Sequence, residues 1–87
     1  MRVGVHLFME IEVKLFAIFQ HYLPLGSGPY SCKLRLEIEA QVKDVLNYLN
    51  LPNEMPKILL LNGIQCKPDS RLREGDVLSI FPPLGGG

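Results

Sequence analysis

The sequence predicts an α+β fold, in which one helix packs across a single mixed sheet of four or five strands. Two observations support this prediction. Segments in which apolar and polar residues alternate, the period of a half-buried strand, lie on both sides of one segment with helical periodicity, and turn residues separate them. The 87 residues suffice for one domain, because a chain this short buries only about 60–65% of its unfolded surface. We therefore expect a single core.

The first predicted strand covers residues 11–15, where apolar residues alternate with Glu12 and Lys14. Phe16 then falls on the polar face of this strand. A short helical turn is predicted over residues 17–22, and the glycines and proline of residues 26–29 predict a turn or flexible loop. No Gly-Lys-Ser/Thr sequence follows these glycines, so the loop does not match a phosphate-binding loop.

The clearest strand covers residues 33–39, in which Leu34, Leu36 and Ile38 share one face. It predicts a hairpin with the first strand. Apolar residues of the next segment recur at the spacing of one helical face: Val42, Val45, Leu46 and Leu49. This helix begins without a Ser or Thr cap. It is predicted to end at residues 50–52, since a proline excludes the preceding residue from the helical conformation.

Two further strands and a final one follow the helix. Residues 57–61 are mostly apolar and are followed by an Asn-Gly pair and by residues 64–67, which predicts a second hairpin. The last strand covers residues 76–81, with Leu78 and Ile80 on one face and Phe81 on the other. Strand parity therefore predicts that Phe16 and Phe81 both lie on the sheet face away from the helix.

Charge and cysteine content exclude several classes of function. Nine basic residues balance nine acidic ones, so no net charge favours a nucleic acid or a membrane as partner. Cys32 and Cys66 match no metal-ligand spacing and are interpreted as small core residues. We expect neither a bound metal nor a bound cofactor. Residues 1–9 lack the cleavage site of a signal peptide and are interpreted as an N-terminal extension, which makes a cytoplasmic location the expectation.

Residues 82–87 form a tail that cannot contribute to a core, because its three terminal glycines have no side chains to bury. Pro82 and Pro83 fix φ and stiffen the exit from the last strand. Composition alone is equally compatible with a disordered end and with a functional tail, since chain termini commonly lack order.

The sequence resembles the family of molybdopterin-synthase small subunits and thiamine sulfur carriers, known as MoaD/ThiS. Five stretches carry the resemblance: VKLFA at 13–17, VKDVLNYL at 42–49, LNG at 61–63, LREGDVL at 72–78 and FPPLGGG at 81–87. The resemblance as a whole extends over most of the chain from Glu10 onward. The resemblance implies that residues 10–81 form a ubiquitin-like β-grasp domain. The Phe-Pro-Pro sequence is more similar to the molybdopterin branch than to the thiamine branch.

Members of this family are sulfur carriers, and the resemblance implies the same chemistry here. An adenylating enzyme of the ubiquitin-activating type uses ATP to join AMP to the carboxylate of the terminal glycine, which is Gly87. A sulfur donor then converts the acyl-adenylate to a thiocarboxylate. In the molybdopterin branch the tail enters a large subunit that holds the catalytic side chains. This chain would then be a carrier without catalytic side chains of its own.

The resemblance assigns the chemistry to Gly87, and Gly86 has a steric role, because a residue without Cβ fits a narrow channel. Six further residues are predicted to bind partners: Phe16, Phe81, Pro82, Pro83, Leu84 and Gly85. Exposed aromatic side chains on a charged sheet face often mark interfaces. The alternative is that a loop or the N-terminal extension covers the two phenylalanines.

Three other functions stay open at this point. A thiamine-type carrier would deliver sulfur from the same thiocarboxylate to a different acceptor. A ubiquitin-related modifier would form isopeptide bonds through Gly87, and a β-grasp binding module would carry no chemistry. A ferredoxin of this fold is excluded, because its cluster needs four cysteines and the chain has two.

Overall fold

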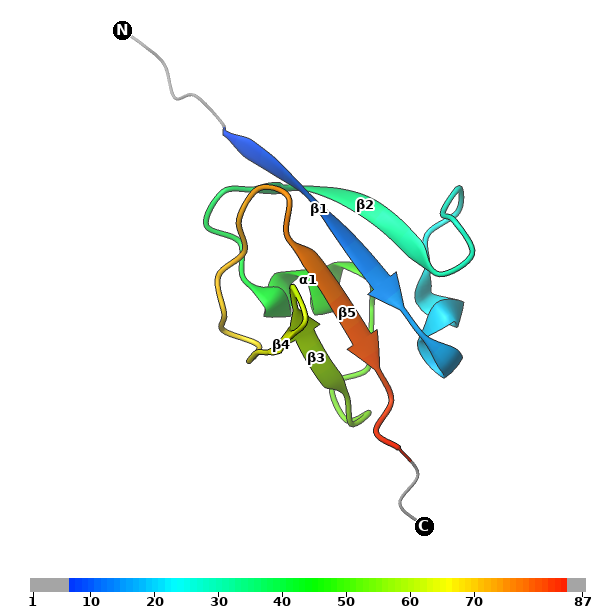
Figure 1. Ribbon diagram of the computed structural model, residues 1–87. Coiled ribbons are helices and arrows are strands. Elements are labelled where there is room, and N and C mark those ends of the chain that lie inside the picture. Colours follow the sequence, from blue (N-terminus) through cyan, green and yellow to red (C-terminus); the bar gives the residue numbers. More distant parts are fainter. Residues whose placement is uncertain (1–6, 85–87) are drawn as a thin grey trace, which may run out of the picture.

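The computed structural model describes residues 7–84, and residues 1–6 and 85–87 lie outside this description. The elements follow the predicted order (Figure 1): β1 (Phe8–Leu15), a 3-10 helix η1 (Ala17–Tyr22), β2 (Ser31–Glu37), α1 (Val42–Tyr48), β3 (Ile58–Leu61), β4 (Ile64–Gln65) and β5 (Val77–Phe81). The strands form one mixed five-stranded sheet. The predicted α+β class is therefore confirmed.

The two strands that are farthest apart in the sequence form the centre of the sheet. The strand order is β2-β1-β5-β3-β4, in which β1 and β5 are parallel and the other pairs are antiparallel. Because β1 and β5 run side by side in the same direction, they end at the same edge of the molecule (Figure 1). The segments around residues 16 and 81 are thereby brought together.

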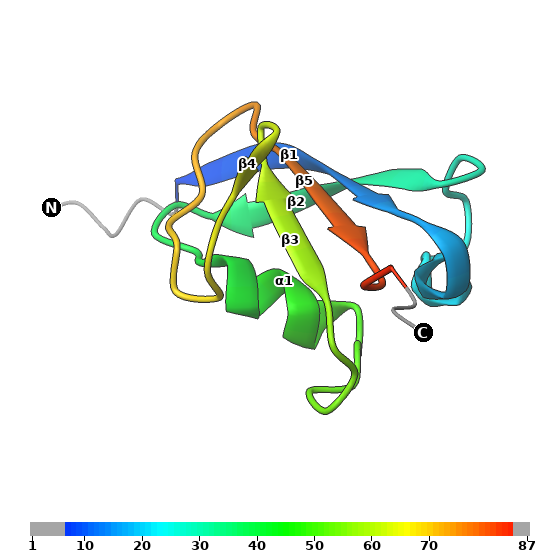
Figure 2. The same ribbon diagram turned by 60° about the horizontal axis from the view of Figure 1, so that its bottom comes forward.

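The helix α1 covers one face of the sheet and leaves the other face uncovered (Figure 2). The core comes from the predicted apolar faces: Met9, Ile11, Val13 and Leu15 of β1, Leu78 and Ile80 of β5, and Val42, Val45, Leu46 and Leu49 in and directly after α1. Phe19 of η1 is also fully buried. Burying a side chain of this size contributes roughly 1.5–3 kcal/mol, so the helix–sheet contact is a main source of stability.

Both ends of α1 are fixed by short-range hydrogen bonds. Gln41 stands where a Ser or Thr cap is usual, and its backbone N–H donates to the Asp44 carboxylate at 2.8 Å, the return bond of a capping box. At the other end Asn50 has a φ of 62°. The Leu51 N–H donates to the Leu46 carbonyl oxygen at 3.0 Å, as in a Schellman motif. The helix therefore ends at Tyr48, slightly before the predicted residues 50–52, because the chain turns at Asn50 and not at the proline.

The second hairpin and the loop before β5 are tied together. Asn62 and Gly63 have φ values of 53° and 84°, as a type I′ turn requires. The Asp76 carboxylate accepts from the Arg73 N–H at 2.8 Å and from the Asn62 side-chain amide at 2.9 Å. The Asn62 side-chain oxygen accepts from the Val77 N–H at 2.8 Å. The LREGDVL stretch therefore has a structural role, which is to join the β3–β4 turn to the start of β5.

Every strand differs from its expected bounds. β3 begins at Ile58 and β5 at Val77, one residue late in each case, and β4 ends at Gln65 and not at residue 67. β1 begins at Phe8, inside the segment interpreted as an extension, and Met9 is buried and pairs with Leu36. The apolar period of residues 11, 13 and 15 in fact continues to residue 9. β2 covers 31–37 rather than 33–39, so Ile38 lies beyond its end and is exposed. The chain leaves the sheet there because it turns at Glu39, which has a φ of 87°.

Candidate functional site

The chain leaves the sheet at the end of β5, in the middle of the strand order. Pro82 is half-buried, Pro83 is exposed, and the Leu84 side chain is 91% exposed. The predicted tail residues Gly85, Gly86 and Gly87 lie outside the described residues. What the structure describes is therefore the base of the tail and the surface around it.

Three aromatic side chains stack beside this exit. The ring centroids of Phe16 and Phe81 lie 4.4 Å apart, with an angle of 3° between the ring planes. The Tyr30 ring lies 5.6 Å from the Phe16 ring, at an angle of 23°. Tyr30, Phe16 and Phe81 are named the aromatic row below. Aromatic contacts contribute about 0.5–1.5 kcal/mol beyond their buried area, so the row is a stable feature of the surface.

The position of Phe16 depends on the conformation of its neighbour. The Phe16 N–H donates to the Ile80 carbonyl oxygen at 3.1 Å, which ties the end of β1 to β5. Ala17 then adopts a φ of 55°, a conformation that costs a residue with a Cβ roughly 1–2 kcal/mol. This turn lets Phe16 stay on the outside while Phe19 enters the core. No feature of the sequence signals it.

Tyr30 was missed by the sequence analysis. It lies in the loop before β2, where strand parity makes no prediction. The structure holds it in place through its backbone, because the Leu15 N–H donates to the Tyr30 carbonyl oxygen at 2.7 Å. Its side chain is 44% exposed. Tyr30 therefore extends the pair of phenylalanines toward the β2 side of the sheet.

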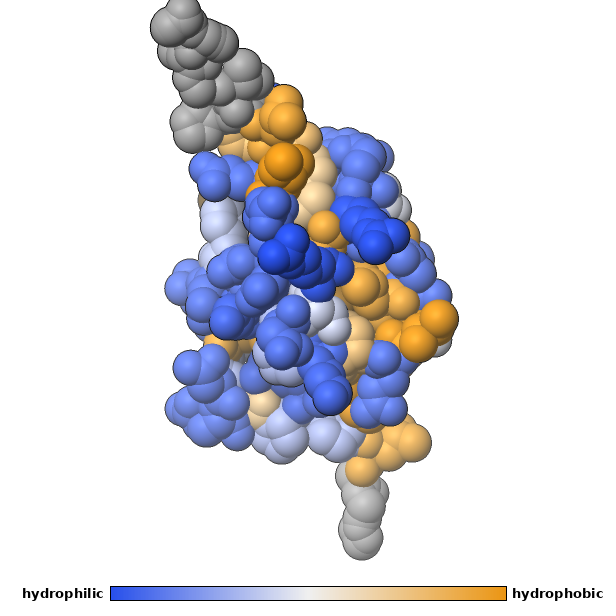
Figure 3. All heavy atoms as spheres, turned by 90° about the vertical axis from the view of Figure 1, so that its left-hand side faces the viewer, coloured by the Kyte–Doolittle hydropathy of each residue, from blue (hydrophilic) through white to orange (hydrophobic). Residues whose placement is uncertain are grey.

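The aromatic row belongs to a larger apolar area on the uncovered sheet face. Ile58 of β3 is paired with Phe81, and both are half-buried. Figure 3 shows hydrophobic side chains gathered toward the side of the uncovered face and down to the end of the described chain, beside a largely hydrophilic surface. Phe16 is half-buried too, and its ring stacks on those of Phe81 and Tyr30.

The two cysteines lack the environment of a reactive thiol. Cys32 and Cys66 are both half-buried and pack against the core. Burial raises the pKa of both thiols. For Cys32 a hydrogen bond with Ser27 acts in the opposite direction, and the nearby Glu12 carboxylate adds to the rise in pKa. Both side chains are therefore neutral thiols near pH 7, whereas a nucleophilic cysteine requires a lowered pKa.

The described part of the chain offers no cluster of three His, Cys, Asp or Glu side chains that could hold a metal ion. Within the same residues, no helix is long and apolar enough to cross a membrane.

Known proteins share this architecture. A sequence model of the ThiS family matches residues 13–87, and no curated protein matches. The structure is similar to that of the Haloferax volcanii HVO 2177 protein, with 29% identity, a TM-score of 0.73, and coverage of 92% of this chain and 88% of that chain. It is also similar to SAMP1, small archaeal modifier protein 1, of the same organism, with 25% identity, a TM-score of 0.70, and coverage of 90% and 99%.

A third similar structure is a complex of subunits 1 and 2 of the molybdopterin-converting factor from Helicobacter pylori. The identity is 23%, the TM-score is 0.51, and the match covers 91% of this chain and 100% of that chain. At this identity the similarity speaks for the fold alone. Together the neighbours confirm the predicted ubiquitin-like β-grasp architecture.

Proposed function

Because the chain belongs to the ThiS family, we propose that it is a sulfur carrier whose Gly87 carboxylate becomes a thiocarboxylate and supplies sulfur for molybdopterin synthesis. The family match carries this proposal, since it extends through the tail to Gly87 itself. The Phe-Pro-Pro sequence at 81–83 supports molybdopterin as the product.

The chemistry needs activation, because a free carboxylate is a poor electrophile. A Gly87 carboxylate oxygen attacks the α-phosphorus of ATP in the adenylating enzyme, and pyrophosphate leaves. A hydrosulfide equivalent from the sulfur donor then attacks the acyl carbon, and AMP leaves with the electron pair of the C–O bond. One proton is released, and the thiocarboxylate remains. The catalytic side chains belong to the partners.

The body of the protein has to offset the cost of ordering the tail. Fixing the backbone of the three glycines costs about 1–2 kcal/mol each in conformational entropy. Inserting the tail into a partner's active site therefore costs roughly 3–6 kcal/mol of binding free energy. We assign the compensating contacts to the surface at the tail's base, the aromatic row with Pro82, Pro83 and Leu84. The adenylating enzyme and the large subunit both need the same tail, so both are expected to dock on this surface in turn.

The test alters the end of the chain and leaves the body unchanged. Adding one alanine after Gly87, or deleting residues 86 and 87, should abolish adenylation, because misplacement by about 1 Å can cost a hundredfold in rate. The assay is ATP–pyrophosphate exchange with the cognate adenylating enzyme, followed by intact mass to detect one oxygen replaced by sulfur. Asp69→Ala is the control, since it changes an exposed position in the loop between β4 and β5 and leaves the tail unaltered. An extended chain that is adenylated and thiolated as well as the original would refute the proposal.

A protein modifier is the second candidate, and the similarity to SAMP1 favours it. A modifier would pass the same Gly87 adenylate to a lysine amine of a target. The two functions predict different forms of the chain in its native host. A carrier gives free protein with a thiocarboxylate mass, whereas a modifier gives a ladder of larger conjugates on a denaturing gel. Conjugates that disappear when Gly86 and Gly87 are deleted would decide for the modifier.

A thiamine-type carrier shares the thiocarboxylate and differs in its acceptor. The proposed product is tested by mixing the thiocarboxylated chain with the molybdopterin synthase large subunit of the same host and its pterin precursor. Formation of the dithiolene together with return of the Gly87 carboxylate supports the proposal. Sulfur that stays on the chain here, but is accepted by the thiazole-forming enzyme, would assign the chain to thiamine synthesis.

A further inference from the structure

The outer edge of β2 has backbone groups that point away from the sheet. β2 is the first strand in the sheet order. Its ladder with β1 contains the Leu15 N–H to Tyr30 bond of 2.7 Å at one end and the Ile38 N–H to Leu7 bond of 3.1 Å at the other. Hydrogen-bonded pairs alternate along an antiparallel ladder. The N–H and C=O groups of Lys33 and Arg35 therefore face outward, and no strand of residues 7–84 lies beside them.

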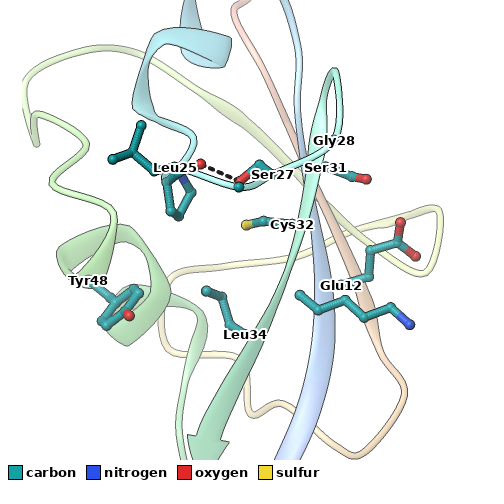
Figure 4. A pocket seen from close by; sticks show the side chains of 11 residues that line it. Glu12, Leu25, Ser27, Gly28, Ser31, Cys32, Leu34 and Tyr48 are labelled. Atoms are coloured by element: carbon teal, nitrogen blue, oxygen red, sulfur yellow. Dashed lines mark hydrogen bonds between the residues drawn. The ribbon is translucent and has the colours of Figure 1, made fainter.

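A groove runs along this edge, between β2 and α1. A cavity of ≈ 530 Å³ occupies one half of it. Its lining includes both apolar residues, among them Cys32, Leu34 and Tyr48, and polar ones, among them Glu12, Ser27 and Lys33. Figure 4 shows that Cys32 and Leu34 of β2 and Tyr48 of α1 face the same space, whereas the Leu25 side chain points away from it. A second cavity, of ≈ 400 Å³, shares Tyr48 and continues past Leu36 to Ile38, where the carboxylates of Glu37, Glu39 and Asp44 also line it. The apolar side chains of an added strand, and not its acidic ones, would therefore face this part of the groove. The groove thus follows the whole of β2.

Large apolar side chains along the groove are exposed to solvent. Leu25 is fully exposed, Tyr48 is 64% exposed and Ile38 is 43% exposed. A single exposed hydrophobic residue needs no explanation. Here three of them lie beside an unpaired strand edge. A peptide strand that is added to such an edge gains affinity from backbone hydrogen bonds and specificity from pockets for every second side chain.

We propose that the β2 edge and its groove bind an extended segment of a partner protein, in which apolar side chains alternate with acidic ones. Successive side chains of an added strand point to opposite faces. One set would enter the groove beside Leu34 and Leu36. The other set would lie on the uncovered sheet face beside Lys33 and Arg35, both of which are exposed. Acidic side chains at those positions give each cation an opposite charge as its cross-strand neighbour.

In the register centred on Leu34, a second copy of this chain fits the edge less well. If two β2 strands paired antiparallel about Leu34, Lys33 of each copy would lie opposite Arg35 of the other. Like charges directly opposite each other destabilise a strand pair, and lysine on an edge is a common device against such pairing. On the β1 side the same two cations face Glu12 and Glu10, which shows that this sheet pairs them with acidic residues.

The site is separate from the tail. The edge lies two strands away from β5 in the sheet order β2-β1-β5. A partner that adds a strand to β2 would therefore leave the aromatic row accessible, and both surfaces can be occupied at the same time. The proposal does not depend on what Gly87 carries.

The direct test is an NMR titration of the full ¹⁵N-labelled chain with a capped heptapeptide of alternating valine and aspartate. We expect saturable shifts of the Lys33 and Arg35 amide signals and slower exchange of these two amide hydrogens with solvent. A heptapeptide of alternating valine and lysine serves as the charge control and should not bind. If millimolar valine–aspartate peptide leaves both amides unprotected, or the lysine peptide binds equally well, the proposal is wrong.

Lys33→Pro removes one outward donor without breaking a bond to β1, since proline is tolerated on an edge strand where the N–H faces solvent. The variant should lose saturable binding, and Lys33→Arg, which keeps both the amide and the positive charge, should retain it. Unchanged signals of β1 and α1 show that the variant is folded. Should Lys33→Pro fail to fold, Tyr48→Ala replaces it and should weaken binding several-fold. Equal binding by the folded variant, or a dimer in sedimentation that Lys33→Pro dissociates, would overturn the proposal.

Discussion

Phe81 is the last residue of β5 and the first aromatic side chain before the tail. Its ring stacks on Phe16, and its backbone is paired with Ile58 of β3. A core phenylalanine costs about 3–5 kcal/mol when it is truncated to alanine. Phe81 is only half-buried, so its loss should affect the fold less than it affects a complex in which the ring becomes buried.

We predict that Phe81→Ala lowers stability by about 1–2 kcal/mol and weakens binding to the cognate large subunit by on the order of tenfold to a hundredfold. Thermal unfolding and isothermal calorimetry measure the two effects. Phe8→Ala is the control, because Phe8 is an exposed aromatic at the other end of β1. Unchanged affinity of the Phe81 variant, or an equal loss in the Phe8 variant, would exclude the aromatic row as the docking surface.

The cysteines give a second prediction at the residue scale. Since burial raises the pKa of both thiols, alkylation by iodoacetamide should be slow at pH 7 and should accelerate as the pH rises, because only the thiolate reacts. The double variant Cys32→Ser, Cys66→Ser should still acquire sulfur at Gly87, which intact mass would detect. A folded double variant that cannot be thiolated would mean that a thiol takes part in the transfer.

α1 is a short helix, and its stability depends on the interactions at its two ends. It has seven residues, fewer than an isolated helix needs to be stable in water. Its C-terminal turn requires Asn50 at a φ of 62° and the bond from Leu51 to Leu46. Both leucines are buried, so the end of the helix also fixes part of the core.

We predict that Asn50→Gly stabilises the protein by roughly 0.5–1 kcal/mol, because glycine adopts positive φ without a steric cost. Asn50→Ala should destabilise it by about 1 kcal/mol, since alanine pays that cost without the local hydrogen bonding of an asparagine. Chemical denaturation measures both variants against the parent chain. Equal stability of the glycine and alanine variants would show that this turn does not limit the stability.

The loop before β5 is the second element-scale test. Asp76 accepts hydrogen bonds from Arg73 and Asn62. Asp76→Ala should therefore cost about 0.5–1.5 kcal/mol, the net contribution of a typical hydrogen bond whose exposed partner can bind water instead. Asp69→Ala removes a carboxylate from an exposed position in the loop between β4 and β5 and should change stability by less than about 0.5 kcal/mol. If both variants lose the same stability in urea denaturation, the network around Asp76 is not what holds the loop.

At the scale of the whole molecule, folding and chemistry use different parts of the chain. The buried residues found among 7–84 form one hydrophobic cluster between the sheet and α1. The reactive group of the proposed function lies at residue 87. Deleting residues 85–87 should therefore leave the Tm unchanged within measurement error while sulfur transfer is lost. A clear fall in Tm would show that the tail also stabilises the body.

The sequence by itself determined the local structure. The strand period on β1, the helical spacing from Val42 to Leu49 and the Asn62-Gly63 turn all depend on residues within four positions of one another. Such short-range preferences act within the segment itself and do not depend on its position in the tertiary structure. The sequence also determined the family, through motifs that extend to the tail. Strand parity was enough to place Phe16 and Phe81 on one face.

Only the tertiary structure decided which segments are neighbours. The backbone hydrogen bonds of a strand pair form almost regardless of the side chains, and closing a longer loop costs little extra free energy. The alternation of apolar and polar residues identifies the strands but does not say that β5 lies beside β1. That pairing brings Phe16 and Phe81 within 4.4 Å. It also leaves β2 as an edge. Tyr30 belongs to the aromatic row although it lies in a loop, where no hydrophobic periodicity predicts its position. The positive φ of Ala17 is locally unfavourable and is maintained by the surrounding fold.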